Sequence, residues 1–321
     1  MNLEDKYKKI EFNVERDFSD TFGTSFTFLR QNFKKLFLSL LYLAGPFLLI
    51  AALLNSIYSQ TAFDMESMIQ GAANTPFGIF TPMYFLSLLF TLAGSLVFMG
   101  VVFEYMVLYD ERGYDGFQVA DVWKRFKQDI GRVIGAFFGL LLVGILLGIG
   151  IAIIVFIFSF LGAGGGIIIG LLAFVGVLIF GLPIGFIFTV VYLIVIKERI
   201  GFWQALRKAR FVLKNNFWIT WVIMFLAYLI IAILAIIVSL PLSISTGVSV
   251  FNGFTTGGDF SILLVILTII SVFGENMIRS IFLIIAGFHY FSLNEQKEGI
   301  GLLNQIDEIG KSDNSGDEIS I

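Results

Sequence analysis

Cysteine is absent from this chain, and histidine occurs only once, at His289. Without thiols there is no disulfide, no thiolate metal site and no cysteine nucleophile, and one histidine does not make a metal site by itself. Charge is also scarce: 14% of the residues are charged, where a soluble protein has about 25%. The net charge of -3 indicates no nucleic-acid partner, and the shortage of charge excludes an ordinary soluble core.

The few basic residues are confined to four short segments. Residues 6–35, 112–132, 197–214 and 297–311 contain 20 of the 21 Lys and Arg residues, and the remaining one is Arg279. Each long gap between these segments holds two apolar runs, joined by a connection without Lys or Arg. Because Lys and Arg are enriched in cytoplasmic loops, the pattern predicts six membrane crossings with both termini in the cytoplasm.

Six stretches are long enough to span a membrane as helices, since about 20 apolar residues cross a hydrocarbon core of about 30 Å. The sequence therefore predicts an all-α, polytopic membrane protein with three transmembrane hairpins. These form a single membrane domain, residues 1–290, followed by an acidic cytoplasmic tail at 291–321 that is partly disordered. The predicted spans are 36–56, 84–108, 133–160, 167–196, 217–240 and 262–290.

A basic, amphipathic stretch precedes each odd-numbered span. The three stretches share a pattern of an apolar, a basic, an amide, an Asn or Asp and an apolar residue, at 29–33, 126–130 and 213–217. This recurrence predicts a threefold repeat of an interfacial helix and a hairpin, with each helix lying along the cytoplasmic headgroup layer. The alternative is that any basic helix before a span has this pattern. The expected lipid-interface residues are Trp123, Lys124, Trp203, Arg207, Lys208, Arg210, Lys214, Trp218 and Trp221.

Polar residues inside the predicted spans form a candidate intramembrane cluster. Glu275 and Arg279 lie one helical turn apart in the last span, with Asn276 beside them, and Glu104 lies near the inner end of the second span. Because unpaired charges are costly in hydrocarbon, we expect Arg279 to bond Glu275, Glu104 or both. The cluster would act as a structural clamp between the second and sixth spans, or it would line a pathway for a substrate or for protons.

Small residues and prolines mark the third and fourth spans. Glycines at four-residue spacing let helix backbones approach closely, which predicts tight pairing of these two spans, and contact between two copies of the chain is the alternative. Pro183 in the fourth span and Pro46 in the first each remove a backbone hydrogen bond, and we expect a kink or a hinge at Pro183. The packing and kink residues are Gly135, Gly139, Gly144, Gly148, Gly181, Pro183 and Gly185.

Two segments carry a resemblance to a known family. They are residues 22–47 and 202–228, each of which contains an Asn-Phe pair at the entry to a span. In these segments the chain resembles uncharacterised bacterial six-helix membrane proteins, which are similar to the membrane domain that accompanies some glycerophosphoryl diester phosphodiesterases. The resemblance implies a bacterial inner (plasma) membrane location. It carries no catalytic residue, because the phosphodiesterase chemistry of that family belongs to a separate soluble domain.

No catalytic constellation is recognisable, and the sequence predicts neither an enzyme nor a cofactor or metal site. The leading hypothesis is an integral membrane protein that organises lipid or partner proteins at the cytoplasmic face of the membrane. The alternative is a transporter or permease for a small molecule, a lipid or an ion, using the level of Glu275 and Arg279. The expected partners are membrane lipids and either another membrane protein or a second copy of the chain.

Overall fold

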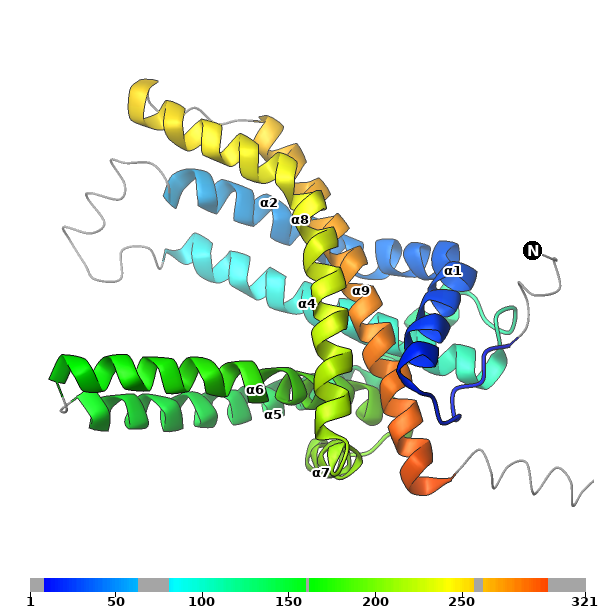
Figure 1. The fold of residues 1–321 in the computed structure, drawn as a ribbon. Helices are drawn as coiled ribbons and strands as arrows, with labels where there is room; N and C mark the ends of the chain where they lie inside the picture. The colour runs from blue at the N-terminus through cyan, green and yellow to red at the C-terminus, as the bar shows by residue number, and fades with distance from the viewer. Residues whose placement is uncertain (1–8, 63–80, 160–161, 257–261, 300–321) are drawn as a thin grey trace, which may run out of the picture.

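The computed structural model describes residues 9–62, 81–159, 162–256 and 262–299 (Figure 1). In these ranges it contains eight α-helices and no β-strand, which confirms the all-α prediction. The helices are α1 (Phe18–Leu43), α2 (Gly45–Ala62), α4 (Pro82–Arg112), α5 (Val119–Ser159), α6 (Gly162–Glu198), α7 (Phe202–Leu213), α8 (Phe217–Thr256) and α9 (Ile262–Glu298).

Most of these helices are long and apolar enough to cross a membrane. Within the described residues, α4, α5, the second part of α6 (Ile179–Glu198), α8 and α9 each meet this condition. α1 and α2 meet it together, but they join at a bend of 60°. The described chain therefore has five apolar helices of spanning length, or six if the bent pair counts as one, as a multi-pass membrane protein requires.

The predicted first span, 36–56, is not one straight helix. α1 ends at Leu43 and α2 begins at Gly45, so the break falls inside the predicted span. Pro46 accounts for the break, because its nitrogen has no hydrogen to donate and its ring crowds the preceding turn. The amphipathic stretch expected before this span is the first part of α1.

The second amphipathic stretch is continuous with its span. α5 runs for 41 residues, so the stretch and the predicted span 133–160 form one helix. No proline interrupts this segment, and single glycines are tolerated in helix interiors. Of the three stretches, the third alone forms a short helix of its own, α7, which follows Gly201 and ends just before Asn215, a residue with a left-handed backbone (φ 74°).

The domain boundary predicted at residue 290 falls inside a helix. α9 continues to Glu298, and residues 291–295 are all buried. Phe291 is fully buried and lies 4.0 Å beneath the Lys197 ammonium group, measured to the ring centroid. The first part of the predicted tail is thus part of the folded helix bundle, and residues 300–321 lie outside the described part of the chain.

Helices adjacent in sequence pack together, α2 against α4, α5 against α6 and α8 against α9. In Figure 1, α8 and α9 run across the other helices, and α9 contacts α1, α2, α4 and α6. Burial is densest at one end of the bundle, where every residue of 101–109 in α4, 190–196 in α6 and 283–295 in α9 is buried. We call this end the charged end. It comprises the last turns of α4, α6 and α9, the first turns of α1, α5 and α8, and α7.

An N-terminal segment outside the helices, residues 9–17, lies over the charged end. Phe12 is almost fully buried, and the Ile10 backbone nitrogen donates to the Tyr109 hydroxyl at 3.1 Å. The Arg16 backbone nitrogen donates to Ser292 Oγ at 2.8 Å, and the same hydroxyl donates back to the Arg16 oxygen at 3.1 Å. The rings that surround Phe12 are Phe28, Tyr109, Phe288 and Phe291.

Candidate functional site

The ion pairs formed by the described residues all lie at the charged end. One lies within α5, and the others join α4, α5, α6, α7 and α9 to one another. They are Arg125–Glu104, Arg125–Glu111, Arg132–Asp129, Lys197–Asp110, Arg199–Asp129, Lys208–Glu198 and Lys208–Glu298. In the described part of the chain, no three His, Asp or Glu side chains are grouped so that they could hold a metal ion.

Glu104 is joined to Arg125 of α5, which corrects the expected bond to Arg279. The Glu104 side chain is fully buried, and its Oε2 lies 3.0 Å from the Nε of Arg125. Arg125 also donates from both terminal nitrogens to Glu111, with Nη2 2.8 Å from Oε1. One arginine therefore holds two carboxylates of α4, and this ionic clamp joins the second and third spans rather than the second and sixth.

Glu104 does not pair with Arg279 because the two residues lie at different depths in the helix bundle. Gly287 of α9 lies against Met106 of α4, since a Cβ added to Gly287 would be 2.6 Å from the Met106 Cε. Glu104 is then level with residues near 285, and Arg279 is about 9 Å further along α9 at 1.5 Å per residue. Counting depth from the ends of the spans treats the helices as parallel rods, whereas α9 crosses the other helices (Figure 1).

The other three residues of the predicted cluster lie on α9, away from Glu104. Arg279 is exposed, and neither Arg279 nor Glu275 forms an ion pair with any described residue. Asn276 is buried and donates from Nδ2 to the Val272 backbone oxygen at 2.7 Å, within its own helix. The predicted cluster is therefore divided between two levels of the molecule.

Asp129 and Arg125 are site residues that the sequence prediction missed. Asp129 is fully buried and lies within hydrogen-bonding reach of Glu104. It pairs with Arg132 one turn along α5 and with Arg199 after α6, whose Nη2 lies 3.7 Å from Oδ2. The two buried acidic groups are thus surrounded by three arginines, which offset only part of the cost of removing them from water.

The signal for Asp129 was present in the shared pattern of the amphipathic stretches. Asp129 occupies the position held by Asn32 in the first stretch and by Asn216 in the third. Asn32 is also fully buried, and its Oδ1 accepts a hydrogen bond from the Tyr105 hydroxyl at 2.9 Å. In the first two stretches, the residue at this position is therefore in polar contact with α4: Asn32 with Tyr105, and Asp129 with Glu104.

α7 has one face packed in the protein and one face outside it. Its buried face consists of Ala205, Leu206, Ala209, Val212 and Leu213. The opposite face, which we call the basic face of α7, consists of Trp203, Arg207, Arg210, Phe211 and Lys214, all of them exposed. Its three cations form no ion pair with a described residue. Basic residues interspersed with large apolar rings are typical of helices at the headgroup layer.

Lys208 differs from its neighbours on α7. Its Nζ lies 2.7 Å from Glu198 Oε1 and 2.8 Å from Glu298 Oε1. Burial alone would lower the pKa of Lys208, but its hydrogen bonds to these two carboxylates raise the pKa above the ordinary value. Lys208 therefore ties α7 to the ends of α6 and α9, although the sequence groups it with the lipid-facing residues Arg207 and Arg210.

The four tryptophans lie at or beside the charged end but differ in exposure. Trp203 on α7 is 56% exposed and Trp218 at the start of α8 is 67% exposed. Trp123 stacks on the buried Phe126, and Trp221 stacks on a neighbouring ring of α8. Lys124 is exposed beside Trp123. Trp203 and Trp218 are thus the two that present most of their ring to the surroundings.

Among the described residues, most of the predicted packing glycines make no close contact between the third and fourth spans. For four of them an added Cβ would meet no described atom within 4 Å: Gly135, Gly144, Gly148 and Gly185. At Gly181 it would meet only Val177 of the same helix, whereas at Gly139 it would lie 2.4 Å from the ring of Phe202. Gly139 therefore makes room for α7. Pro183 is buried inside α6, which continues through it as one helix.

Comparison of the chain with protein-family models, curated proteins and solved structures finds no match. The resemblance to the membrane domain that accompanies glycerophosphoryl diester phosphodiesterases therefore stays a prediction. The charged end combines a buried ionic network with the exposed basic face of α7.

Proposed function

We propose that this chain is a non-enzymatic membrane protein that binds and organises anionic phospholipids at the cytoplasmic face of a bacterial inner membrane. The observation that carries the proposal is the basic face of α7. Its cations Arg207, Arg210 and Lys214 have no acidic partner among the described residues, while Lys208 on the inner side of the same helix has two. These three positive charges are therefore available to bind an anionic partner outside the described fold.

Anionic phospholipid headgroups fit the chemistry of this face. Each Lys or Arg near an anionic membrane surface contributes about 1 kcal/mol of attraction, so three cations supply about 3 kcal/mol. The exposed rings of Trp203 and Phe211 lie on the same helix and are suited to the boundary between headgroups and acyl chains. Charge and apolar contact would then act on the same lipid layer.

The orientation in the membrane is part of the proposal. The Lys and Arg residues of the described helices lie at the charged end, apart from Arg279, and basic segments are retained in the cytoplasm. The helices would cross the bilayer as three hairpins, with both termini and α7 on the cytoplasmic side. α7 would lie along the headgroup layer, held there by its buried face.

The test measures lipid preference around the protein in nanodiscs that contain phosphatidylglycerol and phosphatidylcholine. Spin-labelled lipids report the fraction of each headgroup class that the protein immobilises. We expect the native chain to prefer phosphatidylglycerol and the triple variant R207Q/R210Q/K214Q to lose most of that preference. Because these side chains are exposed, the variant should keep the thermal stability of the native chain in detergent.

Lys208→Gln provides a matched control on the same helix. It should lower the thermal stability, since Glu198 and Glu298 lose their shared cation, but it should leave the lipid preference unchanged in the folded fraction. The proposal is wrong if the triple variant retains the full preference for phosphatidylglycerol. It is also wrong if the native chain shows no preference at low ionic strength.

A further inference from the structure

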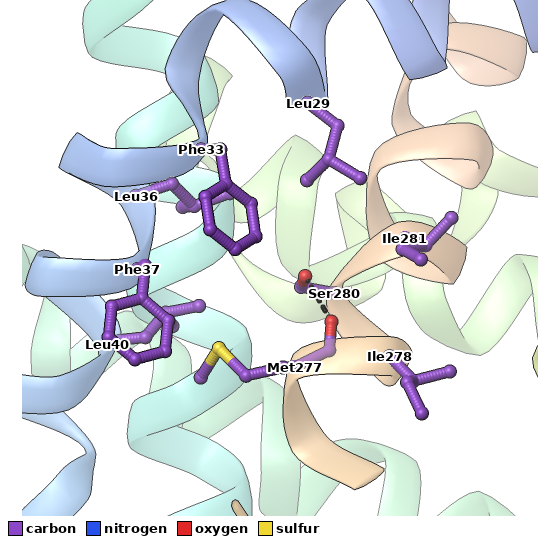
Figure 2. Close-up of a pocket in the computed structure, with 9 residues that line it drawn as sticks. All are labelled: Leu29, Phe33, Leu36, Phe37, Leu40, Met277, Ile278, Ser280 and Ile281. Atoms are coloured by element: carbon purple, nitrogen blue, oxygen red, sulfur yellow. Dashed lines mark hydrogen bonds between the residues drawn. The ribbon is translucent and has the colours of Figure 1, made fainter. Parts of the chain in front are cut away.

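An apolar groove of about 160 Å³ lies between α1 and α9. Figure 2 shows Phe33 and Phe37 of α1 on one side of the groove and Met277, Ser280 and Ile281 of α9 on the other. The only hydroxyl of the lining belongs to Ser280, and it donates to the Met277 backbone oxygen at 2.6 Å. The walls therefore offer no free polar group, and the groove suits a hydrocarbon chain.

The length of the groove matches one leaflet of a bilayer. Its lining extends along α1 from Leu29 to Leu40, which is about 16 Å at 1.5 Å per residue. A hydrocarbon core is about 30 Å thick, so the groove is about as long as one leaflet is thick. One of its walls, Phe33, is 57% exposed, which leaves the groove open to the surrounding lipid.

Positive charge lies beside the half of the groove that begins at Leu29. Arg30 follows Leu29 and Lys34 follows Phe33 on α1; both are exposed, and neither forms an ion pair with a described residue. Lys35, in contrast, is used inside the fold, where its Nζ donates to the Tyr114 oxygen at 2.5 Å. The opposite end of the groove, near Met277, is apolar. This polarity matches a phospholipid, with its headgroup at Arg30 and its acyl chain along the groove.

We infer that the groove between α1 and α9 is a specific site for one anionic phospholipid of the leaflet that faces the charged end. An acyl chain lies between Phe33 and Met277, and the phosphate is bound by Arg30 and Lys34. The site is separate from the basic face of α7 and goes beyond the function proposed for it. α7 would act on many headgroups through charge, whereas the groove holds a single molecule through shape and charge together.

The experiment is a titration of the purified full-length protein with phosphatidylglycerol, followed by native mass spectrometry. We expect one phosphatidylglycerol to remain bound at detergent concentrations that remove all other lipid, and phosphatidylcholine to bind more weakly. Ile281→Trp fills the groove and should abolish this bound lipid. Arg30→Gln should weaken phosphatidylglycerol binding about tenfold, the effect of losing one charge-assisted hydrogen bond, while leaving phosphatidylcholine unchanged.

Arg279→Gln is the matched control. Arg279 is a cation on the same helix, but residues two positions apart in an α-helix point in nearly opposite directions, so it faces away from Met277 and Ile281. This variant should bind phosphatidylglycerol as the native chain does, and so should R207Q/R210Q/K214Q, which separates the groove from α7. If Ile281→Trp does not fold, Phe33→Ala at the exposed wall replaces it and should weaken binding of both lipids.

Several outcomes would overturn the inference. One is a native chain that retains no lipid, and another is a bound lipid that survives both Arg30→Gln and the groove variant. A dimer that the groove variant dissociates would assign the groove to a second copy of the chain instead. Equal weakening by Arg30→Gln and Arg279→Gln would show that general charge, and not the groove, holds the lipid.

Discussion

α4 and α5 are neighbouring apolar helices that occupy opposite environments. In the most apolar stretch of α4, 39% of the residues are buried, and in that of α5 only 6% are, although α5 is the more apolar of the two. α4 packs against α1, α2, α5, α6 and α9, whereas much of α5 beyond residue 140 is exposed. In a membrane protein, apolarity alone therefore does not identify the buried helix, because lipid is as apolar as the protein core.

Small and polar side chains are better markers of the interior here. The buried residues of α4 include Ser87, Gly94, Gly100 and Glu104, which allow close approach or bond to another helix. The exposed part of α5 instead carries large apolar side chains such as Ile145, Leu146 and Phe156. Three pairs of substitutions test whether the difference in burial between α4 and α5 determines how much each position contributes to stability.

The largest effect is expected where the two helices are tied together by charge. Arg125→Ala would leave the buried Glu104 carboxylate without its cation, and the loss of a partner from a buried ion pair costs about 3–5 kcal/mol. Lys124→Ala, at an exposed position next to it, should change the free energy of unfolding by less than about 0.5 kcal/mol. Denaturant titration in detergent micelles measures both, and equal losses would contradict the structural role of Arg125.

A smaller effect is expected from adding one methyl group to each helix. At Gly100 of α4 an added Cβ would lie 2.3 Å from the Phe126 ring, so Gly100→Ala should destabilise the protein by about 1–3 kcal/mol. At Gly144 of α5 no described atom lies within 4 Å of it, and Gly144→Ala should be neutral or stabilise the helix by up to about 1 kcal/mol. Thermal unfolding in the same detergent compares them. A stable Gly100→Ala protein would mean that Phe126 moves freely, against its complete burial.

The smallest effect is expected from the same substitution on both helices. Phe98 of α4 is 1% exposed and Phe138 of α5 is 60% exposed. Phe98→Leu should cost about 1 kcal/mol, because it leaves a small cavity in a packed site, while Phe138→Leu should be within about 0.5 kcal/mol of the native chain. Identical melting temperatures for the two variants would show that the surroundings of α5 are as closely packed as those of α4.

The number and length of the apolar helices could be predicted because the thickness of the bilayer fixes them. The break between Leu43 and Gly45 could be predicted only in part. Pro46 indicates a kink, but the apolar run crosses it without interruption, and a run of apolar residues carries no information about the angle between its two halves. The sequence did not predict that the second amphipathic stretch and the third span form one helix, α5. An amphipathic surface helix followed by a span, and a single helix that contains both, have the same sequence pattern.

The partners of charged residues could not be predicted, because they depend on how the helices cross. From the sequence, several cations are expected at about the same depth in the membrane as Glu104. Only the packing of α5 on α4 shows that its partner is Arg125. The case of Lys208 and Arg207 is similar. Their positions in the sequence show that the two side chains point in different directions from α7. They do not show that Glu198 of α6 and Glu298 of α9 lie on the side of Lys208.

The N-terminal segment has a consequence for the order in which the protein is built. Arg16 and Ser292, which share two hydrogen bonds, are 276 residues apart in the chain. A ribosome that adds about 5–20 residues per second makes Phe12 roughly 14 to 55 seconds before the phenylalanines of α9 that surround it. Residues 9–17 are therefore synthesised well before the part of α9 that they contact, so their docking must follow the insertion of α9.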